Sequence, residues 1–329
     1  MLTSLRNEFV YYTRYGLVSA KQALGMRLTG DKRHMGDRLV RGVRAGRITQ
    51  KTVLTVDIRN DGIGSQALSR LSVEATARDL GLRYAYRPFE SIAHAEGDPA
   101  QWLARCESAF ALGEGRPRIG DFDLPMLKLN QFASNRKLWS QPHIVTIGNM
   151  YIHCDRAPSI YRPIIELKQP ISCGAGLLRI AAHVRRGDVS QRRISHRFTS
   201  NKTVVAVLKQ VVACIRAADL PHEVTVFSNG HPREFADFAD LGFRVDLTTG
   251  ALEVFDQLRS SDVLLTAKST FSYFAALHSN AIVLYEPFSR CPLPSWILRS
   301  GGNFETEAFN EQLQILARRI ARGKSGGRA

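Results

Sequence analysis

The sequence predicts an α/β protein made of two Rossmann-like domains that face a cleft. Short apolar, β-branched runs alternate with helical patterns along most of the chain, and polar turns follow several of these runs. The 329 residues, 44% of them hydrophobic, are enough to bury the cores of two ordinary domains. Because strand–helix–strand crossovers pair their strands in parallel, we expect mainly parallel sheets.

Four segments are expected along the chain. Residues 1–50 form a basic segment with helical periodicity, and residues 51–165 form an N-terminal Rossmann-like domain. Residues 166–320 form a C-terminal Rossmann-like domain, and residues 321–329 form a disordered tail rich in Gly and charged residues.

The first domain begins with a strand–helix–strand unit. Its strands are expected at residues 52–58 and 82–86, with a helix at residues 65–80 between them. Pro, Gly and Asp interrupt the following stretch, where we expect one helix at residues 99–112 and one strand at residues 143–147.

The second domain shows the clearer alternation. Strands are expected at residues 177–184, 223–227, 243–247, 262–266 and 281–285, and helices at residues 201–218, 232–241 and 271–279. Five strands separated by helices predict one parallel sheet.

The most informative stretch is residues 177–188, where an apolar run ends in His183, Arg185, Arg186 and Asp188. In an open α/β sheet, ligands bind outside the carboxyl ends of the strands, and guanidinium groups there suit a phosphate or a carboxylate. The alternative is a strand end whose arginines are only solvated.

Three other turns follow predicted strands. Gly62 and Gly64 precede the first helix, Ser228 and Asn229 follow one strand, and Ser269, Thr270 and Phe271 follow another. Glycines or hydroxyls at a helix start favour an anion, although each turn also fits an ordinary tight turn or helix cap. Glu253, at the start of a helical segment, is a carboxylate suited to the N–H groups of guanine, and it also fits a favourable place in the helix dipole.

In this order, the H-x-R-R-G-D, V-F-S-N and S-T-F-S motifs and the G-x-G turn resemble the fucosyltransferase superfamily, which includes α-1,2-, α-1,6- and protein O-fucosyltransferases. The resemblance covers roughly residues 52–285, with no matching motif in residues 87–165. The α-1,2 group usually has Trp-Trp where this chain has Tyr273-Phe274, which leaves the linkage and the acceptor open.

The resemblance implies a GT-B architecture and inverting transfer of fucose from GDP-fucose to a hydroxyl of a glycan or a lipid-linked oligosaccharide. It implies no cofactor and no metal. Arg185 would hold the β-phosphate, with Asp188 and His196 as nearby candidates for a proton acceptor. The remaining donor-binding residues would be His183, Arg186, Ser228, Asn229, Glu253, Ser269, Thr270, Phe271, Gly62 and Gly64. A different nucleotide sugar is the first alternative.

Charge and hydropathy define the other options. The chain has 45 Lys and Arg against 30 Asp and Glu, a net charge of +15 that favours an anionic partner. A non-catalytic nucleic-acid-binding protein is therefore an alternative, but the basic residues are not interleaved with aromatics, and we expect no nucleic acid.

Residues 1–30 contain a basic amphipathic pattern that fits either a membrane surface or packing on the protein itself. Without a signal peptide or a membrane span, and with five scattered cysteines, we expect a cytoplasmic protein, peripheral at the inner membrane face if residues 1–30 bind it.

Overall fold

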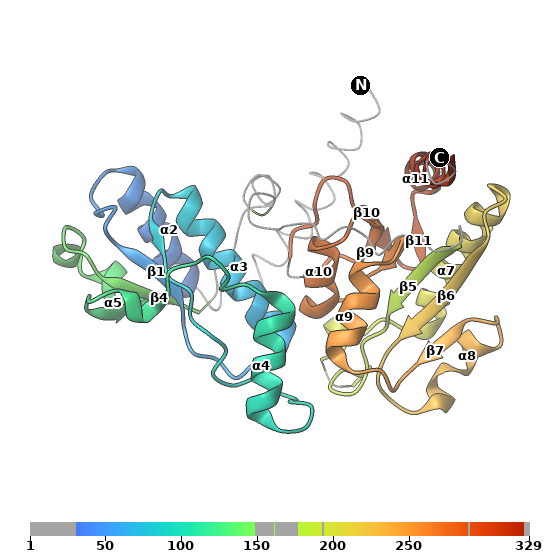
Figure 1. Cartoon of the computed structure of the whole chain (residues 1–329), viewed down its shortest axis with the longest axis horizontal. Helices are drawn as coiled ribbons and strands as arrows, with labels where there is room; N and C mark the ends of the chain where they lie inside the picture. Colours follow the sequence, from blue (N-terminus) through green and yellow to red (C-terminus); the bar gives the residue numbers. More distant parts are fainter. Residues whose placement is uncertain (1–30, 149–160, 162–176, 193, 289, 326–329) are drawn as a thin grey trace. The chain divides into compact units, whose positions relative to one another are not determined.

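The structure is a computed structural model, which describes residues 31–148, 161, 177–192, 194–288 and 290–325. The chain divides into two compact units, Met1–Ile164 (unit 1) and Ile165–Ala329 (unit 2). Each unit is an α/β structure built on its own sheet (Figure 1). The predicted α/β class with parallel sheets is therefore confirmed.

Unit 1 contains a four-stranded parallel sheet in the order β2–β1–β4–β3. Its strands are β1 (Val53–Val56), β2 (Arg83–Tyr84), β3 (Met126–Lys128) and β4 (Ile144–Ile147). The two central strands, β1 and β4, are buried along their whole length. Their sequences, VLTV and IVTI, consist of Leu and β-branched residues without alternating charged positions, which is typical of parallel strands covered on both faces.

The helices of unit 1 are α2 (Asp31–Arg44), α3 (Ile63–Asp79), α4 (Pro99–Phe110) and α5 (Leu129–Ser134), with 3-10 turns η2 (Ile119–Asp121) and η3 (Arg136–Leu138). Leu39, Val73 and Phe132, from three of these helices, share one core with alternate residues of β1 and β4. Helix α3 is buried along nearly its whole length, so its polar side chains have partners inside the unit. The Arg70 guanidinium donates to two backbone carbonyls, and Glu74 pairs with Arg78 and Arg116.

Unit 2 contains a seven-stranded sheet in the order β11–β10–β9–β8–β5–β6–β7, parallel except for the β10–β11 pair. The strands are β5 (Leu178–His183), β6 (His222–Phe227), β7 (Arg244–Asp246), β8 (Val263–Leu265), β9 (Ile282–Tyr285), β10 (Ile297–Ser300) and β11 (Asn303–Phe304). Strand β5 has β8 on one side and β6 on the other.

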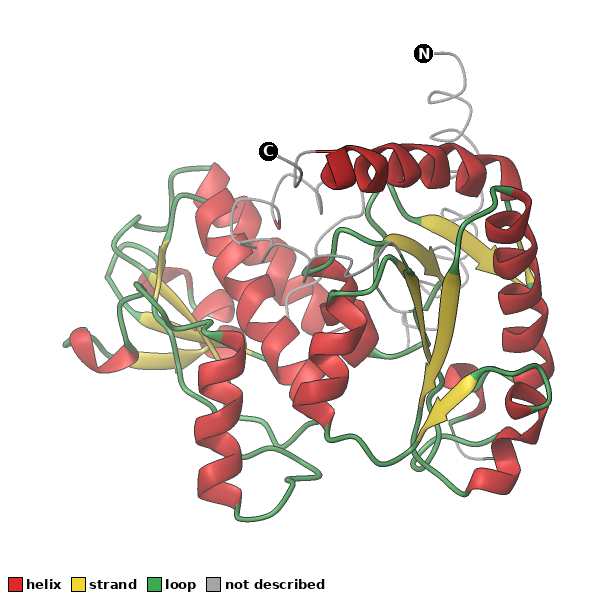
Figure 2. Cartoon of the chain, turned by 45° about the vertical axis from the view of Figure 1, so that its right-hand side comes forward, coloured by secondary structure: helices red, strands yellow, loops and turns green. Residues whose placement is uncertain are grey.

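Helices cover both faces of this sheet (Figures 1 and 2). They are α7 (Asn201–Ala217), α8 (Ala236–Ala239), α9 (Ala251–Arg259), α10 (Thr270–Leu277) and α11 (Thr306–Ser325), with 3-10 turns η5 (Ser195–Arg197) and η6 (Pro232–Phe235). Leu208 of α7, Phe238 of α8 and Phe309 of α11 belong to the core on one face. Helices α9 and α10 pack against each other, with Phe255 stacked on Phe274 at a ring-centroid distance of 5.5 Å.

The elements predicted in both units are confirmed, with small shifts at their ends. The predicted helix at residues 99–112 ends at Phe110, because Ala111 adopts a left-handed backbone conformation. The helix predicted at residues 232–241 begins as the 3-10 turn η6 and ends at Ala239. Elements β3, α5, β10, β11 and α11 were not predicted.

Two further predictions need correction. Helix α11 continues to Ser325, so residues 321–325 are helical and not part of a disordered tail. The scattered cysteines were expected to be reduced thiols. Cys106 and Cys214 are free thiols, but Cys291 is disulfide-bonded, so this expectation does not hold for Cys291. The amphipathic pattern in residues 1–30 lies outside the described residues. Within the described part of the chain, no helix is long and apolar enough to cross a bilayer.

Candidate functional site

The carboxyl ends of β5 and β8 mark the place in unit 2 where the order of strands reverses. From β5 the chain proceeds to β6 and β7 on one side, and then returns to β8 and β9 on the other. Ligands of open α/β sheets bind at such a switch point, outside the carboxyl ends of the strands. The turns after β5 and β8 are therefore the place to look for a site.

The turn after β5 presents a guanidinium group that is held by its own loop. Arg185 Nε and Nη2 donate to the two carboxylate oxygens of Asp188 at 3.2 and 2.7 Å. Gly187 between them has φ +76°, a left-handed conformation that favours glycine, and a Cβ there would lie 2.9 Å from the Asn229 amide nitrogen. The turn needs Gly187 for its backbone shape, and that shape brings Asp188 back onto Arg185.

The turn after β8 meets Arg185 from the other side of the switch point. Arg185 Nη1 lies 3.5 Å from Ser269 Oγ. Ser269 is the N-cap of α10, and its hydroxyl accepts from the Phe271 backbone N–H at 3.3 Å, with Thr270 as the first helical residue. A guanidinium beside a helix N-terminus is a favourable place for an anion, because both contribute positive potential.

His183, the last residue of β5, lies beside these turns as a neutral imidazole. Its ring contacts Phe271 edge-on at 5.6 Å, and Phe271 in turn contacts Phe255 at 6.2 Å. Burial, and next the charge of Arg185, lower the pKa of His183 to about 3. Glu253 is exposed in the first turn of α9, on the same helix as Phe255. The predicted His183 and Phe271 thus belong to one aromatic cluster with Phe255, and Glu253 lies two residues before Phe255 on α9.

Arg186 is used inside the protein. Its guanidinium donates to the backbone oxygens of Arg185 at 2.8 Å and Thr199 at 3.1 Å, and to the Asn201 side chain. It also lies over the Phe198 ring at 4.6 Å. Burial lowers its pKa. These contacts give Arg186 a role in holding the loop between β5 and α7.

Ser228 and Asn229 connect the turns after β5 and β6. The Ser228 hydroxyl donates to the Val184 backbone oxygen, and Asn229 packs over Gly187. A cavity of about 530 Å³ opens on this side of the Arg185 turn, lined by residues that include Arg186, Phe198, Asn201, Gly230 and Glu234. The structure therefore brings the predicted β6 residues against the turn that holds Arg185.

The three remaining predicted residues lie on other elements. His196 is exposed on η5. Gly62 caps α3 in unit 1 with φ −61°, a conformation open to any residue, and Gly64 is buried inside that helix. The backbone conformation at Gly62 therefore does not require glycine.

Two functional candidates were missed from the sequence, Lys268 and Glu286. Lys268 immediately precedes Ser269, and Glu286 immediately follows β9, so both lie at the carboxyl edge of the sheet. Their position after a predicted strand was the available signal. Among the described residues, no cluster of three His, Cys, Asp or Glu side chains is suited to a metal ion.

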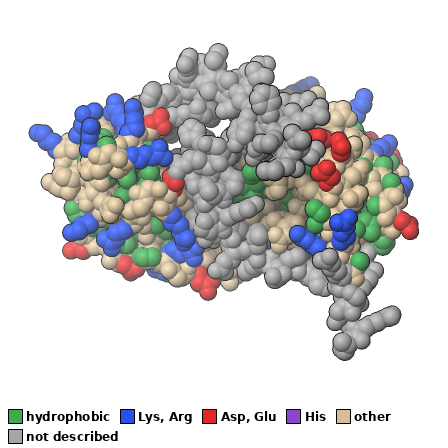
Figure 3. Space-filling view, turned by 90° about the horizontal axis from the view of Figure 1, so that it is seen from above, with side chains coloured by type: hydrophobic (Ala, Val, Ile, Leu, Met, Phe, Trp, Pro, Cys, Tyr) green, Lys and Arg blue, Asp and Glu red, His purple; other side chains and the backbone are tan. Residues whose placement is uncertain are grey.

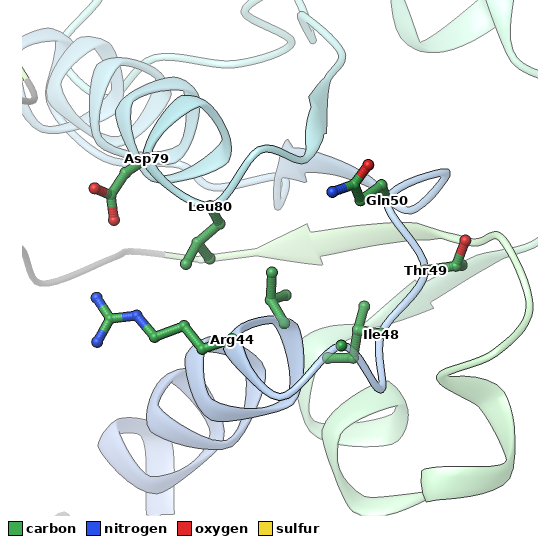
Figure 4. Close-up of a pocket in the computed structure, with 8 residues that line it drawn as sticks. Arg44, Ile48, Thr49, Gln50, Asp79 and Leu80 are labelled. Atoms are coloured by element: carbon green, nitrogen blue, oxygen red, sulfur yellow. The ribbon is translucent and has the colours of Figure 1, made fainter.

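Unit 1 carries a second hollow, about 400 Å³ in volume, which is shown in Figure 4. Arg44 and Asp79 lie at one end of it and Thr49 and Gln50 at the other. Thr49 and Gln50 precede β1, so this hollow is at the amino edge of the sheet, away from the edge where α/β proteins bind ligands. Exposed Arg38, Arg41 and Arg44 make α2 basic, and Lys and Arg side chains gather over this unit at the left of Figure 3.

Comparison with known proteins gives structural matches alone. No family model matches the chain, and no curated protein matches its sequence. The NodZ α-1,6-fucosyltransferase co-crystallised with GDP is similar at 15% identity and a TM-score of 0.41, over 69% of this chain and 92% of that one. POFUT1 in complex with GDP is similar at 12% identity and a TM-score of 0.38, over 70% of this chain and 96% of that one.

A heptosyltransferase is also similar. The E. coli WaaC enzyme with ADP-2-deoxy-2-fluoro heptose matches at 9% identity and a TM-score of 0.33, over 81% of this chain and 99% of that one.

Proposed function

We propose that this chain is an inverting glycosyltransferase that takes its sugar from a nucleoside diphosphate sugar. We propose GDP-fucose as this donor. The observation that carries the proposal is the contact between Arg185 and Ser269 across the switch point of unit 2. A partly exposed guanidinium and a capped helix N-terminus together suit a diphosphate.

The reaction needs charge to be stabilised on the leaving group. As the acceptor oxygen bonds to the anomeric carbon, the bond from that carbon to the β-phosphate oxygen breaks, and its electron pair leaves with the nucleotide. Arg185 is the group placed to neutralise that charge as it develops, a role that elsewhere falls to a divalent cation.

The proton of the acceptor hydroxyl leaves to a base or to water. Asp188 is paired with Arg185 through both oxygens, and we assign it the orientation of that guanidinium. His196, exposed on η5, is then the candidate base. The acceptor is proposed to be a glycan or a lipid-linked oligosaccharide, and no cofactor or metal is proposed.

Substitution of Arg185 tests the proposal. We expect Arg185→Ala to weaken GDP binding about ten- to hundredfold in calorimetry, since a hydrogen bond from a charged group contributes about 1.5–3 kcal/mol. Transfer from GDP-fucose should be lost in the same variant. Arg216→Ala, which removes an exposed arginine at the end of α7, is the matched control and should bind GDP as the parent protein does.

The identity of the nucleotide is tested on the unsubstituted protein. A ligand that binds the native state raises its melting temperature with concentration, so GDP should do so more than UDP or ADP. A larger shift with UDP or ADP would change the donor and keep the enzyme class. No shift with any nucleotide, together with salt-sensitive oligonucleotide binding, would replace the proposal by the nucleic-acid alternative.

A further inference from the structure

Polar contacts and short chain segments form a closed ring that joins the turns after β5, β8 and β9 at the carboxyl edge of the sheet in unit 2, and Glu286 is the residue that closes it. The Glu286 carboxylate is mostly buried, with 11% of the side chain exposed. One oxygen pairs with Lys268 Nζ at 3.1 Å. The other accepts from the Thr199 hydroxyl at 2.6 Å and pairs with Arg299 Nη2 at 2.8 Å.

From Glu286 the ring runs in two directions to Arg185. On one side, Lys268 is followed in the chain by Ser269, whose hydroxyl lies 3.5 Å from Arg185 Nη1. On the other side, the Thr199 backbone oxygen accepts from Arg186, and Arg186 donates to the Arg185 backbone oxygen. The turns after β5 and β8 therefore meet twice, directly at Arg185 and indirectly through Glu286.

The ring is anchored to the sheet by Arg299. Its side chain is 2% exposed, and Nη2 also donates to the Thr266 backbone oxygen at 2.8 Å. Arg299 belongs to β10 and is hydrogen-bonded to the residue that follows β8. Because Arg299 is held in this way, it also holds the Glu286 carboxylate in one position. A buried carboxylate with one hydroxyl and two cations around it keeps its place far better than a surface ion pair does.

We infer that Glu286 is a positioning residue that sets the distance between Arg185 and the Ser269 turn for the diphosphate of the donor. The inference rests on the proposed function and adds a residue to it. Glu286 itself does not touch the donor in this role; it acts through Lys268 and through Thr199. Its effect should therefore fall on the phosphate groups of the ligand and not on the nucleoside.

Two substitutions test the two arms of the ring. Glu286→Gln keeps the size of the side chain and an acceptor for Thr199 but removes the charge that pairs with Lys268 and with the buried Arg299. Thr199→Val removes only the hydroxyl and keeps the shape. We expect each variant to bind GDP at least about tenfold more weakly, because small displacements of positioned groups are costly, and to bind guanosine within about twofold of the parent protein. Glu286→Asp should recover part of the GDP affinity.

Asp262→Asn is the matched control. Asp262 is a buried carboxylate of the same sheet, 5% exposed, but at the amino edge, where it accepts from the Arg179 backbone N–H at 2.8 Å. This variant should lose stability and keep its preference for GDP over guanosine. Circular dichroism of every variant at the assay temperature shows which are folded, and Thr199→Val decides the question if Glu286→Gln is not.

The outcomes separate the inference from the function on which it rests. If the parent protein fails to bind GDP, the proposed function fails. If the parent protein binds GDP and folded Glu286→Gln and Thr199→Val keep the same ratio of GDP to guanosine affinity, only the role of Glu286 is wrong. One case of an unchanged ratio is an equal loss of affinity for GDP and for guanosine. That result would indicate a general loosening of unit 2 and not a role of Glu286 at the phosphate groups.

Discussion

At the scale of single residues, the candidate site of unit 2 is built from side chains that lie far apart in the sequence and come together at one edge of the sheet. Arg185 and Ser269 follow different strands, and they meet because the carboxyl ends of parallel strands share one edge. The structural contacts of Arg186 could not be predicted from the sequence, because two of its three acceptors belong to residues 199–201. The same is true of Glu286, whose partners come from three separate segments.

His183 gives a prediction about pH. Its folded-state pKa of about 3 lies below the ordinary value near 6.5, so between these two pH values the unfolded chain binds a proton that the folded protein does not. Stability should therefore fall as the pH is lowered from about 6.5, and His183 should account for about 1–2 kcal/mol of the loss between about pH 7 and pH 5.

The His183 prediction is checked by urea unfolding at several pH values. His183→Leu should show a smaller decrease in the free energy of unfolding over this range than the parent protein. An identical pH dependence in both proteins would show that the imidazole is not held neutral by the fold.

At the scale of elements, burial decided what the sequence could predict. The central strands of both sheets are largely buried, mainly apolar runs and were predicted, whereas β3 was missed. β3 has only three residues, Met126–Lys128, lies at the sheet edge and alternates between exposed and half-buried positions, so it has neither the length nor the composition that marks a strand. β10 has four residues, two of them polar (ILRS), and β11 has only two residues. Both lie at one end of the sheet in unit 2.

Helix α10 gives a prediction that separates a cap from a binding site. Ser269→Ala removes the hydroxyl that accepts from the Phe271 N–H, which should lower the free energy of unfolding by about 1 kcal/mol. Asp98→Ala removes the corresponding cap of α4, where the carboxylate accepts from the Gln101 N–H at 2.9 Å, and should lower it by about the same amount. Only Ser269→Ala should also weaken GDP binding, measured by calorimetry. If Ser269→Ala and Asp98→Ala bind GDP with equal affinity, Ser269 acts only as a helix cap and does not contribute to GDP binding.

At the scale of the whole molecule, the alternation of strands and helices was enough to predict two α/β units, but not the order of strands within each sheet. In unit 2 the chain adds β6 and β7 on one side of β5 and then returns to add β8 on the other side, so the order of strands reverses at β5. Nothing in the local sequence of the connecting helix α9 specifies that return. The location of the switch point therefore had to come from the structure, whereas the turns that meet there were already singled out in the sequence.

Hydrogen exchange across both units provides the test at this scale. At a GDP concentration about a hundred times its dissociation constant, binding should stabilise the folded protein by about 2.7 kcal/mol. We expect protection of the turns at residues 183–188 and 267–271 in unit 2. The family resemblance implies that Gly62 and Gly64 belong to the sugar-binding part of the donor site, and if so residues 61–66 of unit 1 should gain protection with GDP-fucose and not with GDP. The same exchange at residues 61–66 with both ligands would remove these glycines from the donor site and leave the diphosphate site of unit 2 unaffected.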